Sequence, residues 1–154
     1  MSDILKSSFF LRVTGVAAAL VVSTLGCAAC STVAVDLNVG ECIKLPSDAD
    51  LDNGFEVSSV STTACSKSHD GEVVGMKTIR GESYPGQDEL YAQAKTFCRS
   101  AFKDYTGEDL DSSPLEVFPL LPTKDSWSHS QDRALVCVAV SRDDPLHKSL
   151  KKNT

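Results

Sequence analysis

The sequence lacks the motifs that mark several functional classes. Its 154 residues contain no G-x-S-x-G elbow, no H-E-x-x-H helix, no phosphate-binding glycine loop and no paired-carboxylate motif. It also lacks an excess of positive charge, because 15 Lys and Arg residues face 21 Asp and Glu residues, for a net charge of -6. Nucleic-acid binding needs a basic surface, so a nucleic-acid partner is not expected. We therefore expect a non-enzymatic protein without a cofactor.

Internal repeats and low-complexity linkers are also missing. The length leaves room for one domain of ordinary size and a terminal extension. That extension is residues 1–35, in which Lys6 and Arg12 precede an uncharged, largely apolar run from Val13 to Val35. The run is long enough to cross a hydrocarbon core of about 30 Å. A positive flank followed by an apolar run is typical of an export signal.

Two interpretations of this segment remain open. In the first, Thr24-Leu25-Gly26-Cys27 resembles a bacterial lipobox, in which Cys27 becomes the lipid-modified amino terminus, although Thr24 stands where such motifs usually have Leu. In the second, the segment is an uncleaved signal anchor whose Lys6 and Arg12 stay inside the cell. Both interpretations tie the protein to the cell membrane and place the remaining chain on the extracytoplasmic side.

The cysteines of the exported part predict disulfide bonds. Cys27 and Cys30 lie in the apolar run, which leaves four cysteines for the domain: Cys42, Cys65, Cys98 and Cys137. An even number in an oxidising compartment favours two bridges, for which three pairings are possible. The helical pattern around Cys98 and the strand pattern around Cys137 favour a clamp between these two, with Cys42 joined to Cys65. A zinc site needs closely spaced ligand pairs, and these four are more than twenty residues apart. No metal site is therefore predicted.

A long helix is the clearest predicted element. Apolar residues at the spacing of one helical face are Leu90, Ala94, Phe97, Cys98, Ala101, Phe102 and Tyr105. Asp88 and Glu89 suit the first turn, and Gly107 predicts the end.

Strands are predicted before and after this helix in the sequence. A short strand ends at Pro46, and further strands cover residues 55–60, 72–79 and 133–140. The last is apolar on both faces and is therefore predicted in the interior of the sheet. The prolines in 115–122 limit that run to an edge strand or a loop, and a loop containing Trp127 follows.

These elements predict an α+β fold. Residues 36–142 form one small disulfide-braced domain, a mostly antiparallel sheet with one main helix packed on it. Residues 143–154 form a polar tail with a solvated basic cluster, His147, Lys148, Lys151 and Lys152.

Four residues are candidates for binding: His69, Asp70, Trp127 and Arg133. His69 either holds the turn into the strand at 72–79, contacts a ligand or partner, or acts as a general base oriented by Asp70, for which adjacent residues are poorly placed. Trp127 is either a lid on the sheet or an aromatic anchor for a partner. Arg133 is expected to pair with Asp132 or Asp70.

The order of these residues resembles a known family. It runs Val39-Gly40-Glu41-Cys42, Cys65-Ser66, His69-Asp70-Gly71-Glu72-Val73-Val74, Tyr84-Pro85-Gly86, Cys98, Phe102, Tyr105, Pro122-Thr123, Trp127, Asp132-Arg133 and Cys137. This is similar to the septum-formation domain family of actinobacterial envelopes. The resemblance implies a link to cell division or envelope assembly, without catalytic residues. Where the family tends to have a glycine before the acidic residue and arginine, this chain has Gln131.

Three functions are compatible with these features. The first is a membrane-anchored binding or scaffold module whose partners are envelope or division proteins. The second is a small extracytoplasmic hydrolase using His69 and Asp70. The third is a lipoprotein that carries a ligand in an apolar pocket.

Overall fold

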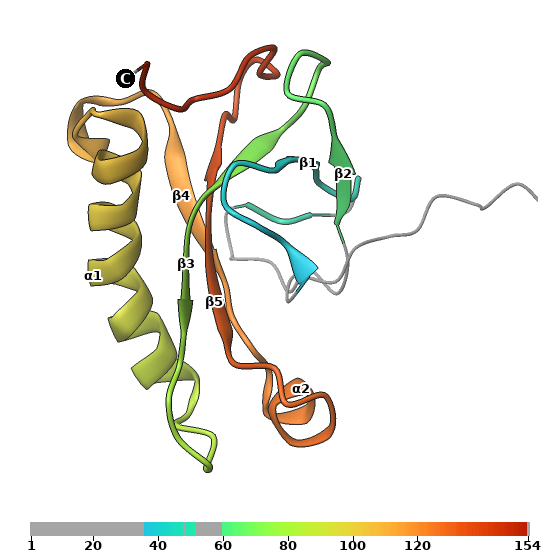
Figure 1. The fold of residues 1–154 in the computed structure, drawn as a ribbon, viewed down its shortest axis with the longest axis vertical. Coiled ribbons are helices and arrows are strands. Elements are labelled where there is room, and N and C mark those ends of the chain that lie inside the picture. Colours follow the sequence, from blue (N-terminus) through green and yellow to red (C-terminus); the bar gives the residue numbers. More distant parts are fainter. Residues whose placement is uncertain (1–35, 48, 52–59, 154) are drawn as a thin grey trace, which may run out of the picture.

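The fold was obtained as a computed structural model, which describes residues 36–47, 49–51 and 60–153 (Figure 1). The elements in chain order are β1 (Cys42–Lys44), β2 (Ser61–Thr63), β3 (Gly71–Thr78), α1 (Gln87–Thr106), a 3₁₀ turn at Leu110–Ser112, β4 (Glu116–Leu120), α2 (Lys124–His129) and β5 (Ala134–Val140). The proposed anchor with Cys27, and nearly all of the strand predicted at 55–60, lie outside the described residues. Within them, no helix combines the length and apolar character needed to cross a bilayer.

One five-stranded sheet organises the domain. Its strand order is β2-β1-β3-β5-β4, and each neighbouring pair is antiparallel. The longest ladder joins β3 to β5, from Gly71 opposite Val140 to Thr78 opposite Ala134. β5 thus lies inside the sheet, as its two apolar faces predicted, and β4 with Pro119 is an edge strand. The predicted α+β class with a mostly antiparallel sheet and one main helix is confirmed.

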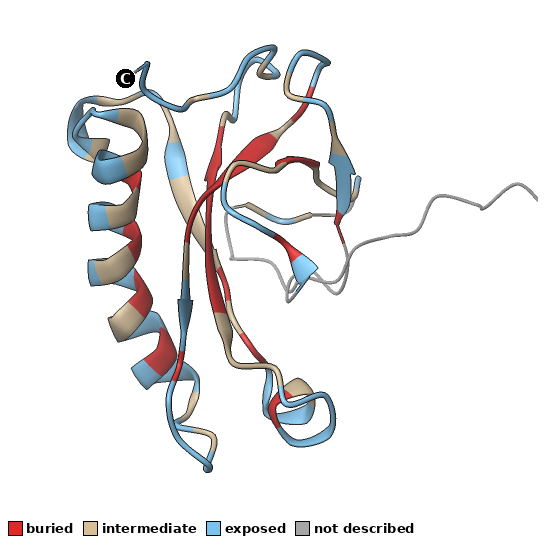
Figure 2. Ribbon diagram, in the orientation of Figure 1, coloured by how far each residue is buried: buried red, intermediate tan, exposed pale blue. Residues whose placement is uncertain are grey.

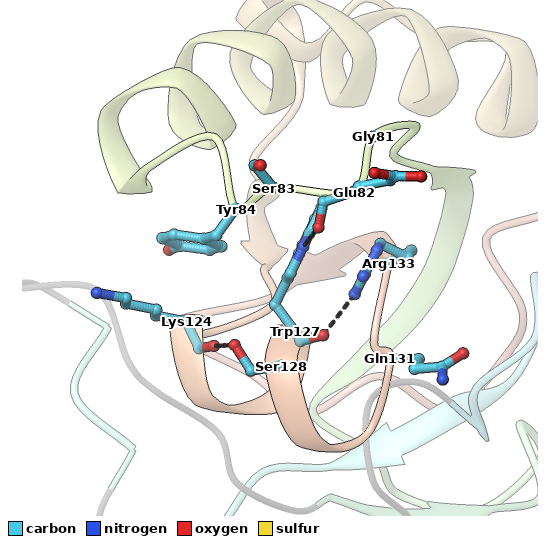
Figure 3. A pocket seen from close by; sticks show the side chains of 9 residues that line it. All are labelled: Gly81, Glu82, Ser83, Tyr84, Lys124, Trp127, Ser128, Gln131 and Arg133. Atoms are coloured by element: carbon cyan, nitrogen blue, oxygen red, sulfur yellow. Dashed lines mark hydrogen bonds between the residues drawn. The ribbon is translucent and has the colours of Figure 1, made fainter.

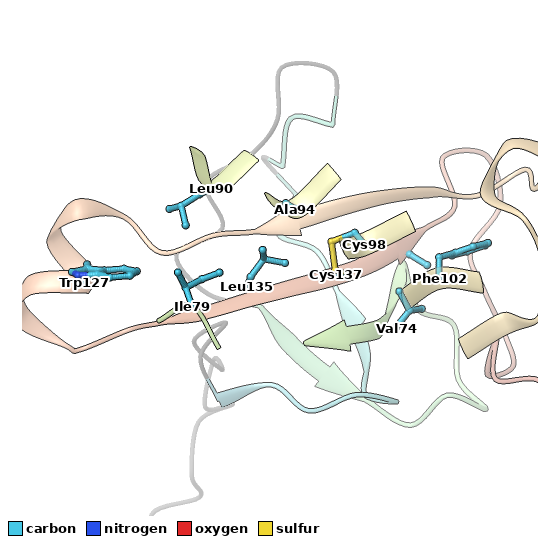
Figure 4. Close-up of a cluster of buried hydrophobic side chains, with 10 residues drawn as sticks. Val74, Ile79, Leu90, Ala94, Cys98, Phe102, Trp127, Leu135 and Cys137 are labelled. Atoms are coloured by element: carbon cyan, nitrogen blue, oxygen red, sulfur yellow. A yellow bond between two sulfur atoms is a disulfide. The ribbon is translucent and has the colours of Figure 1, made fainter. Parts of the chain in front are cut away.

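Apolar side chains fill both faces of this ladder. On the α1 side, Leu135, Cys137 and Ala139 of β5 belong to the same cluster as Leu90 and Phe102 of α1 (Figure 4). On the other side, the alternate residues Val136, Val138 and Val140 pack with Leu37, Ile43 and Val60. β1 and β2 lie on the side of β3 and β5 that faces away from α1 (Figure 1). Buried residues accordingly concentrate in β3, β5 and the inner face of α1 (Figure 2).

Helix α1 buries the predicted apolar face and ends where the sequence predicts. Leu90, Ala94, Cys98 and Phe102 are buried, and Asp88 and Glu89 occupy the first turn. Gly107 closes the helix in the left-handed conformation, φ 83°, and donates its N–H to Lys103 O.

Both predicted disulfides are present. Cys98 of α1 is bonded to Cys137 of β5, with Cα atoms 5.4 Å apart. Cys42 of β1 is bonded to Cys65 in the segment before β3, with Cα atoms 5.2 Å apart. The first bridge fixes the helix to an interior strand, and the second holds β1 to the turn that leads into β3. Each closes a long segment of chain and so restricts the unfolded state.

The loop expected around Trp127 is instead a short helix, α2. Thr123 Oγ1 accepts the N–H of Ser126, and Ser126 Oγ accepts the N–H of Thr123, which forms a capping box. Capping boxes usually carry Glu or Gln at the third helical position, and Ser126 fills that role here. The prediction was wrong because this variant of the start signal was not recognised.

Gly75 allows α1 to approach β3 closely. A Cβ added at Gly75 would overlap the Cβ of Ala101 on α1, because the helix lies directly over this part of the strand. Gly75 also borders the irregularity in the β3–β5 register between Val73 and Gly75. The helix-to-sheet distance here is therefore set by two small residues.

Gly75→Ala is expected to lower the free energy of unfolding by about 1 to 3 kcal/mol, because it overpacks this contact. Ala101→Gly alone is expected to cost about 1 kcal/mol of helix stability. The double variant should be destabilised by less than the sum of the two single effects. Ala101→Gly removes the methyl group that the new methyl group on β3 would meet. Urea unfolding of the four proteins measures this coupling, and strict additivity would contradict the close contact.

Candidate functional site

The four candidate binding residues lie at opposite ends of the β3–β5 ladder. His69 and Asp70 come directly before β3, at the end where Gly71 pairs with Val140. Trp127 and Arg133 come before β5, at the end where Ala134 pairs with Thr78. At about 3.3 Å per residue, the ladder separates the two pairs by roughly 20 Å. The structure therefore brings together Trp127 and Arg133 but keeps His69 and Asp70 apart from them.

A cavity of about 720 Å³ lies beside Trp127 (Figure 3). We call it the Trp127 pocket. It is lined by the segment after β3, by α2 and by the turn before β5, through Gly81, Glu82, Ser83, Tyr84, Lys124, Trp127, Ser128, Gln131 and Arg133. Most of these side chains are polar or charged, so the pocket suits a ligand or partner group that forms hydrogen bonds or ion pairs.

Trp127 forms a fixed wall of this pocket. Its side chain is buried, with 3% of the residue exposed, and its Nε1–H donates to Glu82 O at 3.0 Å. The ring of Tyr84 meets it edge to face, with centroids 5.7 Å apart. These contacts join α2 to the chain that leaves β3. Trp127 is thus part of the packed wall of the pocket.

Arg133 lies over the face of Trp127. Its guanidinium carbon is 3.7 Å from the ring centroid, within cation–π distance. Nη1 donates to the backbone oxygens of Trp127 at 2.8 Å and Asp132 at 2.9 Å. Neither expected carboxylate partner binds it: the Asp132 carboxylate accepts the Ala134 N–H, and Asp70 lies at the other end of the ladder.

The half-buried guanidinium of Arg133 forms no ion pair with any residue that the structure describes. Lys124 adds a second cation to the pocket lining and Glu82 an anion, and both are exposed. Ser83, Ser128 and Gln131 offer neutral hydrogen-bonding groups. The pocket therefore carries a small positive charge within a chain whose net charge is negative.

Gln131 adopts a backbone conformation that suits glycine. Its φ is 53°, and it is the one non-glycine residue with positive φ among the described residues. It is also the position at which the resemblance in the sequence implies glycine. A side chain with a Cβ carries a free-energy cost in this left-handed region, whereas glycine does not. With Gln131, the turn from α2 into β5 is therefore less stable than it would be with glycine at this position.

His69 is fully buried at the other end of the ladder. Its backbone exchanges hydrogen bonds with Leu146, at 2.9 and 2.8 Å, and its Nδ1 lies 2.8 Å from Lys67 O. Because a carbonyl oxygen only accepts, Nδ1 carries the proton. Nε2 has no hydrogen-bond partner among the described residues.

Asp70 binds elsewhere. Its carboxylate oxygens accept from Lys44 Nζ and from Leu45 N, each at 3.0 Å. Asp70 therefore ties the end of β1 to the start of β3. The pair lacks the hydrogen bond by which a carboxylate orients a catalytic imidazole.

Sequence reasoning missed a buried carboxylate next to His69. Glu72 on β3 has no exposed surface, although it lies in a strand predicted to be interior. Tyr105 of α1 and Ser149 donate their hydroxyls to Oε1 at 2.6 and 2.7 Å, and Leu150 N donates to Oε2 at 2.6 Å. A charged residue inside an apolar strand that is predicted to be interior is the signal that could have identified Glu72.

The segment after β5 is more than a solvated tail. The side chains of the basic cluster are exposed, as expected. The backbone between them nevertheless joins the domain, since Leu146 pairs with His69, Leu150 binds Glu72, and Lys152 N donates to Tyr105 O at 3.0 Å. This segment covers the buried cluster around Glu72.

The fold and its two disulfide bonds indicate the class of protein and its compartment. Disulfides form and persist in oxidising compartments, so a small α+β domain with two of them indicates an extracytoplasmic environment. A family model described as Septum formation matches residues 13–137, and the chain belongs to this family. Comparison with curated proteins and with solved structures gave no match.

Gln131→Gly is expected to raise the free energy of unfolding, by up to about 1 kcal/mol, because glycine adopts positive φ without a Cβ penalty. Gln131→Ala is the matched control, since it removes the amide but keeps the Cβ, and it should bring no such gain. Urea unfolding at neutral pH compares the three proteins. Equal stability of the Gly and Ala variants would contradict a strained residue 131.

Tyr105 gives the Glu72 cluster a measurable pH dependence. Burial, with the hydrogen bond to Glu72 as the second cause, raises the pKa of Tyr105 to about 12. Since the folded pKa lies above the usual value of about 10, the stabilisation is complete below pH 10 and is lost as pH rises through 12.

Tyr105→Phe should therefore lower stability at neutral pH by about 1 to 2 kcal/mol, because Glu72 loses a donor. The gap between the two proteins should narrow as the pH rises from about 10 to 12. Unfolding midpoints measured across this range test the prediction. A gap that stays constant would show that the Tyr105 hydroxyl is not linked to folding.

Proposed function

We propose that the protein is a membrane-anchored binding or scaffold module on the extracytoplasmic side of the cell envelope. In this proposal the Trp127 pocket engages an envelope or division partner. The observation that carries it is the Arg133 guanidinium, held in place over Trp127 without an ion-pair partner among the described residues. Removing a charge from water is costly unless it is paired. An acidic or strongly accepting group on a partner would provide that pairing.

The pocket has the composition of an interaction site. Arg, Trp and Tyr are the residues that most often dominate binding energy at interfaces, and Arg133, Trp127 and Tyr84 occur together here. Arg133 is already immobilised by stacking and by two carbonyl contacts. A fixed side chain loses little conformational entropy when a partner binds, which favours affinity.

The two other functions have less support. A hydrolase using His69 and Asp70 would need a contact between them, but His69 Nδ1 binds Lys67 O and the Asp70 carboxylate binds Lys44 and Leu45. A carrier of an apolar ligand would need a sizeable apolar cavity, whereas charged groups of Glu82, Lys124 and Arg133 line the Trp127 pocket. The more apolar hollow between α1 and β4 holds about 240 Å³, below the roughly 300 Å³ at which ligand sites usually begin. Partner binding agrees better with both observations.

Membrane attachment is part of the same proposal. The apolar run ends at Val35, and Leu37 is already buried, with 1% of the residue exposed. The folded domain thus begins directly after the run. A lipid on Cys27 or an uncleaved signal anchor would hold the domain close to the membrane surface, where a partner in the septum or envelope is concentrated.

Site-specific photo-crosslinking in living cells tests the proposal. A photoreactive residue at Ser128, which is exposed and lines the pocket, should form a discrete adduct with an envelope or division component. The same residue at Ser100, exposed on α1 away from the pocket lining, is the matched control and should not. The protein should remain in the membrane fraction after a high-salt wash, as an anchored protein does.

Arg133 variants decide whether the pocket itself causes the adduct. Arg133→Ala should reduce crosslinking from Ser128 by at least about tenfold, since hot-spot truncations cost about 2 kcal/mol or more. Arg133→Lys keeps the charge but loses the planar contact with Trp127, so an intermediate yield is expected. Near-ultraviolet circular dichroism confirms that each variant is folded. Equal adducts from both positions, or adducts that do not respond to Arg133→Ala in a folded protein, would refute the proposal.

A further inference from the structure

Three potential metal ligands converge at the end of the ladder opposite the Trp127 pocket. Cys42 Sγ, a ring nitrogen of His69 and a carboxylate oxygen of Glu72 lie within 4.8 Å of one another, and all three residues are buried. Cys42 reaches this place because β1 pairs with β3 and sets Cys42 opposite Glu72. The fourth side chain is Cys65, which is bonded to Cys42.

The hydrogen bonding of the His69 ring is typical of a metal-binding histidine. Nδ1–H donates to Lys67 O at 2.8 Å, so Nε2 carries the lone pair. Metal-binding histidines usually donate their second ring N–H to a carbonyl or carboxylate in this way. Nε2 is fully buried and has no partner among the described residues, although a buried polar atom without a partner has a free-energy cost. A cation would satisfy it.

The buried carboxylate of Glu72 would also be stabilised by a nearby cation. Its carboxylate is completely buried and is held by neutral donors, the hydroxyls of Tyr105 and Ser149 and the N–H of Leu150. No Lys or Arg of the described residues forms an ion pair with it. Buried carboxylates are usually paired with a cation or bound to a metal. One divalent ion would bind both the Glu72 carboxylate and the Nε2 lone pair of His69.

We propose that Cys42, Cys65, His69 and Glu72 bind a zinc ion when the two cysteines are reduced. The bridged sulfur of a disulfide is a poor ligand, whereas a thiolate is a strong one. Two thiolates, one imidazole and one carboxylate make four ligands, the number that a structural zinc site requires. The reduced form necessarily exists, because disulfides form only after the chain has been made and exported.

Zinc binding and the Cys42–Cys65 bridge exclude each other in this proposal. Binding releases the proton of each thiol and forms two Zn–S bonds. Oxidation by a protein disulfide of an envelope thiol–disulfide oxidoreductase transfers two electrons from the two sulfurs to that disulfide, which takes up two protons and becomes a dithiol. The zinc ion is then released. The site thus gives the newly exported chain a folded state before its bridge has formed.

Three of the proposed ligands are also near one another in the sequence. Cys65, His69 and Glu72 are separated by four and three positions, in β3 and the segment before it. The expectation of no metal site rested on the spacing of the cysteines alone. His69 and Glu72 were not considered as ligands beside them.

Cobalt and zinc titration of the full-length chain in detergent tests the proposal. Cys27 and Cys30 are replaced by Ser in every sample, so that these thiols do not bind metal. The chain reduced with a phosphine under argon should bind one Co²⁺, with thiolate-to-cobalt charge-transfer absorption, and Zn²⁺ should displace it. The disulfide-bonded chain should show no such bands. Absence of the bands from the reduced chain would overturn the proposal.

Two further measurements identify the ligands. His69→Gln should weaken Co²⁺ binding by at least about tenfold, because loss of a supporting group alone costs that much. Asp70→Asn is the matched control, since the Asp70 carboxylate binds Lys44 and Leu45 instead, and it should leave affinity unchanged. X-ray absorption of zinc in the chain with intact His69 and Asp70 needs no further substitution and should give two sulfur and two nitrogen or oxygen neighbours. Four sulfur neighbours, or equal affinities of the two variants, would contradict the site.

Discussion

The pairing of β3 with β5 is the interaction on which the rest of the domain depends. β5 and the first five residues of β3 are buried on both faces. This ladder therefore contributes to the cluster under α1 and to the cluster against Leu37, Ile43 and Val60. The Cys98–Cys137 bridge fixes α1 to the same ladder. A slip of one residue would exchange the two faces of β5 and turn Cys137 away from Cys98 on α1. The bridge and the different side chains of the two faces therefore specify one register.

The ladder also positions the two polar sites of the domain. Each end holds a charged group with no ion-pair partner among the described residues, Arg133 at one end and Glu72 at the other. Their environments differ in a way that matters for function. Arg133 is half-buried and lines an open pocket, so a partner can reach it. Glu72 is sealed by Tyr105 and the segment after β5, so only a small ion fits the role of its partner.

Much of the fold could be predicted from the sequence because its signals are local. The helical spacing from Leu90 to Tyr105, the stop at Gly107 and the apolar run of β5 each depend on neighbouring residues. The favoured disulfides followed from placing Cys98 and Cys137 on such elements. α2 was missed because its start signal uses Ser126 in place of the usual Glu or Gln.

The sites were harder to predict because they depend on contacts between distant segments. Trp127 and Arg133 were recognised as candidates, and they stack across the turn before β5. The contact of Trp127 with Glu82 O, however, joins segments that are 45 residues apart in the chain. Arg133 was expected to bind a carboxylate, and backbone oxygens take that place. No spacing rule could have indicated that Ser149 and Leu150 bind Glu72.

The stretch from Cys65 to Glu72 shows why a local motif can mislead about chemistry. His69 and Asp70 are adjacent and suggest a catalytic pair, yet the alternation of the chain sends Asp70 to Lys44 and His69 into the interior. The polar side chains that lie near His69 in the fold are Glu72, three residues further along, and Cys42, which β1 supplies. A buried imidazole lone pair beside a buried carboxylate and a sulfur is a set of metal-binding groups. That chemistry favours holding a cation over activating water, and it separates the role of this end of the ladder from partner binding at the other.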